Sequence, residues 1–136
     1  MEDADRAIVY GVDDGDAAET VRLVEARGNR GLAIKADVRD GGACDRSVPR
    51  TVETLGRLDV LVNDAAFQMD LERSEEISPE QFRRTRVTIV FGAIQMTRSA
   101  MPHLGEGSKI AESGNIVGMV GNEMPVDHRM ANGAIH

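Results

Sequence analysis

The polar turn Asn63-Asp64-Ala65-Ala66 is the part of this sequence where chemistry is most expected. It directly follows Leu58–Val62, a short apolar run with helical patterns on both sides, which is typical of a buried parallel strand. Open α/β sheets bind their ligands beyond the carboxyl ends of such strands. We therefore expect binding or catalytic side chains at this turn.

A histidine can donate a proton near neutral pH, and His128 has Asn132 one helical turn further on, close enough to orient it. Asn132 carries no charge, however, so a histidine on the solvated face of a helix is the favoured interpretation. No metal site is predicted, because His103, His136 and Cys44 are too scattered.

Hydrophobic spacing indicates the elements that position these residues. Strands are expected at 7–10, 31–38, 58–62 and 114–120, and helices at 17–27, 44–55 and 78–104. Ser78 is the expected N-cap of the last helix, and Pro102 is expected to kink or end it. Strands that alternate with helices predict a doubly wound parallel sheet with right-handed crossovers, in a single domain over residues 1–136.

Composition narrows the class of protein. The 136 residues carry 16 basic and 23 acidic side chains, and a net charge of −7 disfavours nucleic-acid or anionic-membrane surfaces. No run approaches 18 apolar residues, and the acidic start of the chain is unlike a signal peptide. Cys44 is the one cysteine, so no intramolecular disulfide can form. We expect a soluble, cytoplasmic protein.

The stretch Gly56–Ala66 resembles the fourth-strand motif of the short-chain dehydrogenase/reductases, with Asp64 in place of the usual second Asn. Met96–Leu104 is similar to the end of the family's long helix. The resemblance implies an α/β Rossmann-like fold, NAD or NADP as cofactor, reduction or oxidation of a carbonyl/alcohol pair, and a dimer interface on the long helix. It also implies cofactor contacts, on the adenosine side, at four positions: Asp37, Val38, Asn63 and Ala65.

Two parts of the family pattern are missing from these residues. None of the 14 glycines forms the loop that binds the pyrophosphate, so the sheet is expected to be incomplete, without its first strand and its C-terminal part. The family's catalytic Tyr, Lys, Ser and Asn correspond in this chain to His128, Asn132, Asn115 and Ile89. The chain's one tyrosine is Tyr10 and its two lysines are Lys35 and Lys109, so no Tyr-x-x-x-Lys exists.

The sequence therefore favours a short-chain dehydrogenase/reductase-like domain without oxidoreductase activity as an isolated chain. Alternatives are an NAD(P)-dependent oxidoreductase that needs a complementing subunit or a longer reading frame, a non-catalytic protein-interaction module, and a gene remnant. No cofactor is expected to bind tightly, and Asp13 and Asp14 favour NAD in any weak binding. Self-association is expected through the long helix and through unpaired edges of the strands at 7–10 and 58–62.

Overall fold

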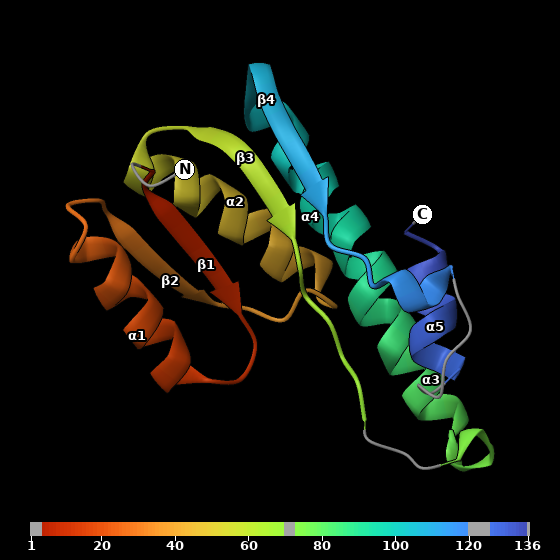
Figure 1. The fold of residues 1–136 in the computed structure, drawn as a ribbon. Coiled ribbons are helices and arrows are strands. Elements are labelled where there is room, and N and C mark those ends of the chain that lie inside the picture. Colours follow the sequence, from red (N-terminus) through yellow and green to blue (C-terminus); the bar gives the residue numbers. More distant parts are fainter. Residues whose placement is uncertain (1–3, 70–72, 120–125, 136) are drawn as a thin grey trace.

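The computed structural model describes residues 4–69, 73–119 and 126–135, in which strands and helices alternate (Figure 1). The strands are β1 (Arg6–Tyr10), β2 (Gly31–Lys35), β3 (Leu58–Asn63) and β4 (Leu104–Glu112). The α-helices are α1 (Asp14–Glu25), α2 (Gly41–Leu55), α3 (Pro79–Arg86), α4 (Gly92–Ala100) and α5 (Val126–Gly133). None of the helices in this part of the chain is long and apolar enough to cross a membrane.

The strands form two separate parallel pairs. β1 pairs with β2, from Arg6 opposite Gly31 onward, and β3 pairs with β4, with Asn63 opposite Glu112. Within the described ranges no ladder joins β1 to β3. The parallel α/β class predicted from the sequence is confirmed, and so is the interruption of the sheet between these two strands.

Local sequence explains where the first two helices begin and end. The side chains of Asp13 and Asp40 cap α1 and α2 by accepting hydrogen bonds from the backbone N–H groups of Asp16 and Gly42, both at 2.9 Å. Helix α2 ends at Gly56, whose φ of 90° lies in the left-handed region that favours glycine.

The helix predicted over 78–104 is interrupted. Ser78 caps it as expected, but α3 passes into a π-helix at Val87–Phe91 before α4 begins. A π-turn accommodates one extra residue per turn, which hydrophobic spacing does not reveal. Helix α4 stops at Ala100, and a 3₁₀ turn at Met101–His103 contains Pro102. The predicted helix end near this proline is confirmed.

The last strand was predicted in the wrong place. β4 covers Leu104–Glu112, whereas Ile116–Gly118 is a 3₁₀ turn and position 120 lies outside the described residues. Pairing sets this register, because the ladder with β3 ends where the N–H of Ser113 donates to the carbonyl of Asn63 at 2.9 Å. β4 is largely exposed, so it lacks the apolar pattern that marks a buried strand.

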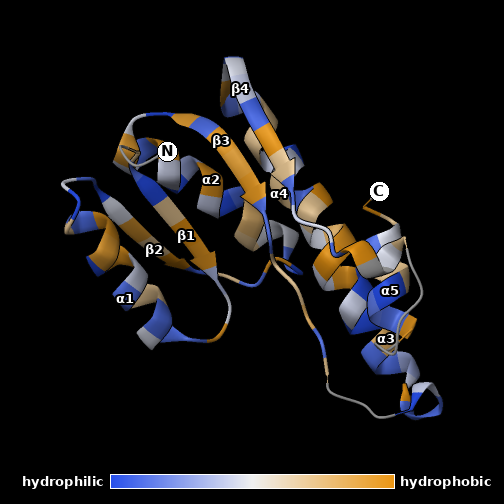
Figure 2. Ribbon diagram, in the orientation of Figure 1, coloured by the Kyte–Doolittle hydropathy of each residue, from blue (hydrophilic) through white to orange (hydrophobic). Residues whose placement is uncertain are grey.

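One apolar cluster joins the two strand pairs. Its buried members come from α2, β3 and α4: Cys44, Val48, Leu61, Met96 and Ala100. Val9 of β1 and Leu104 of β4 pack against it. Helix α2 packs on β1, β2 and β3, so it covers both pairs from one side. Figure 2 shows hydrophobic stretches along β1 and β3, as expected for strands that face this cluster.

Candidate functional site

A pocket of about 480 Å³ lies beyond the carboxyl ends of β3 and β4, where the sequence predicted chemistry. Ile89, Asn115, His128 and Asn132 all line it, together with Asp64 and Ala65 from the turn after β3. The structure thus brings together the four positions that the resemblance equated with the family's catalytic residues. Figure 1 shows α5 lying beside α3.

The side chain of Asn132 connects α5 to the segment after β4 in the pocket wall. Its Oδ1 accepts a hydrogen bond from the backbone N–H of Asn115 at 2.7 Å, and its Nδ2 donates to the carbonyl of His128 at 2.9 Å. The side chain is buried, with 4% of its surface exposed. Close packing supports the same junction, because a Cβ on Gly118 would lie 2.6 Å from the backbone nitrogen of Gly133. Asn132 is therefore a structural clamp between α5 and the segment after β4.

His128 is not the solvated surface histidine that the sequence favoured. Only 6% of it is exposed, and it contributes to the wall of the pocket. Within the described residues its Nδ1 has no hydrogen-bond partner. The sequence missed this burial because it depends on the packing of α5 against other segments, namely Ile116–Gly118 and α3.

A buried polar group next to the pocket was not predicted. The Oδ2 of Asp127 accepts hydrogen bonds from the hydroxyl of Thr85 at 2.8 Å and from the side-chain amide of Gln81 at 3.3 Å. Thr85 has no exposed surface, and Asp127 is 3% exposed. Gln81 and Thr85 are four residues apart and so lie on one face of α3. That spacing was a signal that the sequence offered, since two polar residues occupy the face that the helix buries.

Asn63 is held by the protein at the end of β3. Its Nδ2 donates to the hydroxyl of Thr97 at 3.0 Å and to Oε1 of Glu112 at 2.8 Å. These contacts tie β3 to α4 and to the end of β4. Ala65 lies two residues further on and lines the pocket. The donor group of Asn63 is thus already used within the fold.

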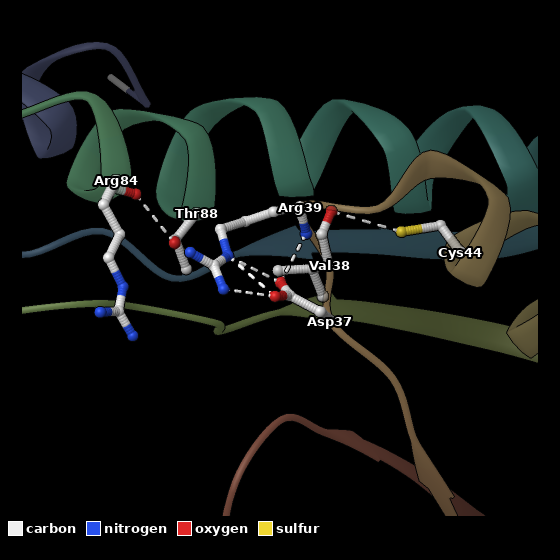
Figure 3. A network of polar contacts seen from close by, with 6 residues as sticks. All are labelled: Asp37, Val38, Arg39, Cys44, Arg84 and Thr88. Atoms are coloured by element: carbon white, nitrogen blue, oxygen red, sulfur yellow. Dashed lines mark hydrogen bonds and ion pairs between the residues drawn. The ribbon is translucent and has the colours of Figure 1, made fainter. Parts of the chain in front are cut away.

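Asp37 forms an ion pair with Arg39, two residues away (Figure 3). The Nε of Arg39 lies 2.9 Å from both carboxylate oxygens, and the backbone N–H of Arg39 donates to Oδ1, also at 2.9 Å. The guanidinium of Arg39 lowers the pKa of Asp37 from its usual value, chiefly through these side-chain hydrogen bonds. The carboxylate of Asp37 is therefore ionised and paired with Arg39.

Val38 lies in the same segment and contacts two helices. Its carbonyl accepts a hydrogen bond from Sγ of Cys44 in α2 at 3.5 Å (Figure 3). On its other side α4 approaches closely, because a Cβ on Gly92 would lie 2.8 Å from Cγ2 of Val38. Burial raises the pKa of the Cys44 thiol. Val38 therefore positions α4 relative to α2.

The only tyrosine lies away from the pocket, on β1. The hydroxyl of Tyr10 donates to Oδ1 of Asp14 at 2.9 Å, and Nζ of Lys35 lies 2.9 Å from both oxygens of the same carboxylate. The hydrogen bond to Asp14 raises the pKa of Tyr10. A phenol used as an acid–base group near neutral pH needs the opposite shift.

Two kinds of site are not formed in the described part of the chain. No group of three His, Cys, Asp or Glu side chains there could hold a metal ion. No hydrolytic triad is formed at the pocket either, since His128 is the one histidine in its wall and its Nδ1 has no partner.

Comparison with known proteins agrees with the family resemblance seen in the sequence. The family model described as enoyl-(acyl carrier protein) reductase matches residues 1–133. An uncharacterized oxidoreductase, YhdF of Bacillus subtilis, is 38% identical over 134 residues, which cover 98% of this chain and 46% of that protein. General stress protein 39 of the same organism is also 38% identical, over 99% of this chain and 47% of its own length. This chain thus spans about half the length of these relatives.

Solved structures show the same relationship. A short chain dehydrogenase from Burkholderia cenocepacia in complex with NADP is similar with a TM-score of 0.89 and 29% identity, over 96% of this chain and 54% of that one. A blue fluorescent protein from a metagenomic library, in complex with NADPH, is similar with a TM-score of 0.86 and 25% identity, over 96% and 54%.

Proposed function

Since this chain belongs to the short-chain dehydrogenase/reductase family, we propose that it is a member of that family that does not transfer hydride as an isolated chain. The observation that carries the proposal is the state of Asn132. At the position that the resemblance assigns to the family's lysine, an uncharged amide uses both of its polar atoms to hold Asn115 and His128. Asn132 itself therefore supplies no cation that could lower the pKa of a neighbouring acid.

His128 does not replace the acid–base pair that a tyrosine and a lysine form in the family. Acid–base catalysis requires a group within hydrogen-bond reach of the reacting atom and a pKa matched to the operating pH. In the family a tyrosine fills this role with help from the lysine, whereas Tyr10 lies on β1 with a raised pKa. We infer that the pocket at the ends of β3 and β4 is retained while the proton-transfer chemistry is lost.

Two of the residues expected to contact a dinucleotide already have hydrogen-bond partners within the chain. Asp37 is engaged by Arg39, and the amide of Asn63 is engaged by Thr97 and Glu112. A nucleotide would have to displace these contacts, of which the solvent-exposed Asp37–Arg39 ion pair contributes about 0–1 kcal/mol. We therefore propose that NAD and NADP bind only weakly, with dissociation constants in the millimolar range or above. Ligand-observed NMR titration tests this, and micromolar binding of either dinucleotide would overturn it.

The pocket itself supports a second candidate function, an NAD(P)-dependent oxidoreductase that a further subunit completes. Its volume of about 480 Å³ lies within the range of small-molecule sites. The triple variant His128→Tyr, Asn132→Lys and Asn115→Ser tests whether these three side chains alone limit activity. We expect no turnover from it, because the nicotinamide is not positioned and because the Asn132 clamp is broken. Consumption of reduced nicotinamide above buffer would favour the second candidate.

The α4 segment and Cys44 bear on the oligomeric state and the cellular location of the chain. We propose that the chain self-associates and is cytoplasmic. Three large apolar side chains are half exposed along the α4 segment, namely Phe91, Ile94 and Met101, at 45%, 57% and 58%. Positions 91, 94 and 101 share one helical face, as residues of a helix–helix interface do. The one cysteine is free and buried, which suits a reducing compartment.

A further inference from the structure

The pocket beyond the carboxyl ends of β3 and β4 has a carboxylate in its wall and no counter-charge from a basic side chain. Asp64 lines it, and no lysine or arginine of the described ranges does. A smaller cavity shares Ala65, Ile89 and Ser113 with this pocket, and a second carboxylate, that of Glu112, lines it. A concave surface lined by charge of one sign attracts ligands of the opposite sign. The wall therefore favours a cation.

Two departures from the family pattern shift the charge of this wall in the same direction. The resemblance aligns Asp64 with an uncharged Asn, and it aligns Asn132 with a lysine. The first change adds an anion and the second removes a cation. A negatively charged ligand thus meets repulsion from Asp64, whereas a positively charged one gains Coulomb attraction.

His128 adds a buried polar group to the same wall. It lines the pocket, only 6% of it is exposed, and its Nδ1 has no partner within the described residues. A buried polar atom without a partner is costly, so a ligand group that bonds to the ring is favoured. Neutral imidazole has one acceptor nitrogen, and an ammonium group has several N–H donors. One ammonium group can therefore serve both a carboxylate and an imidazole.

The rest of the wall is suited to an apolar group. Ile89 and Ile116 line the pocket together with Ala65 and Ala66. Ile116 is 65% exposed, so an apolar group placed against it removes this surface from water. The volume of about 480 Å³ is that of a small-molecule site.

We propose that this pocket binds a small organic cation, a primary amine with an apolar body. Its ammonium group binds at Asp64 and His128, and its body packs against Ile89 and Ile116. The inference rests on the proposed function in one respect, namely that the pocket holds no tightly bound dinucleotide. It names the class of ligand that the retained pocket takes.

Three probes that differ only in their head group test this with the 136-residue chain. Phenethylamine, 2-phenylethanol and 3-phenylpropanoate carry an ammonium, a hydroxyl and a carboxylate on the same phenylethyl group. They are titrated by ligand-observed NMR at about pH 8, where free imidazole is neutral and an alkylamine is charged. We expect saturable binding of the amine, at least about tenfold tighter than that of the alcohol, and the weakest binding for the carboxylate. Equal affinities for amine and alcohol, or no binding of the amine, would overturn the proposal.

Asp64→Asn and Asp59→Asn are a matched pair of variants. Each removes one negative charge, but Asp59 lies near the start of β3, where it pairs with Arg57 on the surface. We expect Asp64→Asn to weaken amine binding about tenfold and Asp59→Asn to leave it within about twofold, with the alcohol unaffected by either. Equal effects of the two variants on the amine would contradict a site at Asp64. Turnover of reduced nicotinamide by the chain would overturn the proposed function and leave this comparison as it stands.

Discussion

Thr85→Val tests how much the buried polar contact between α3 and α5 stabilises the site. The substitution replaces the hydroxyl that donates to Asp127 Oδ2 at 2.8 Å with a methyl group of similar size. Thr85 has no exposed surface, so water cannot replace the lost donor without local opening. Asp127 is left with the amide of Gln81 at 3.3 Å, and its Oδ1 has no partner within the described residues.

The expected loss of stability is large for a change of one atom. A buried acceptor that loses a donor costs about 1–3 kcal/mol, and Oδ2 of Asp127 would keep only the longer contact with Gln81. We therefore expect the free energy of unfolding to fall by about 2–3 kcal/mol. Urea denaturation followed by circular dichroism measures this, provided that the slope of the transition is unchanged.

Thr88→Val is the matched control, three residues along the same helical segment. Thr88 is 9% exposed, and its hydroxyl donates to the carbonyl of Arg84 at 2.9 Å, within the same segment. That carbonyl also accepts from the N–H of Val87, so it keeps a partner when the hydroxyl is lost. We expect a change below about 0.5 kcal/mol. Equal destabilisation by the two substitutions would refute the role assigned to Asp127.

Three further predictions follow from contacts elsewhere. Burial raises the pKa of Cys44, so a thiol reagent at mildly alkaline pH should react slowly with the native chain and rapidly in urea; equal rates would contradict its burial. Arg39→Ala should raise the pKa of Asp37 toward its usual value of 3.8, as measured by NMR titration. Because the native pKa is lowered, the parent chain should lose this stabilisation as the pH falls below 3.8, and the variant should not. Light scattering at micromolar concentration should show self-association, and a compact monomer that unfolds cooperatively would contradict it.

The sequence predicted those features that depend on local signals. Short apolar runs bounded by glycine and polar turns located β1, β2 and β3, and Ser78 and Pro102 marked the two ends of a helical region. The Asn63 turn predicted a site at the carboxyl ends of the strands, and a pocket lies there. These inferences need no knowledge of distant contacts.

Features set by distant contacts were not predictable in the same way. Strand β4 is largely exposed, so its sequence shows no apolar pattern that would identify a strand. Its bounds are set by the ladder with β3. The burial of His128 depends on segments that precede α5 by many residues. The pairing of Asp37 with Arg39 could have been expected from their proximity, but its geometry depends on the turn after β2.

The most direct test of the proposed function is turnover by the unmodified chain. The absorbance of NADH and NADPH is followed with the purified 136-residue protein and a panel of aldehydes and ketones, with an active short-chain dehydrogenase as positive control. We predict no consumption above the rate in buffer at any substrate concentration. Saturable consumption that His128→Phe abolishes, and that Thr88→Val leaves unchanged, would contradict the proposal and establish His128 as the acid–base group of an active enzyme.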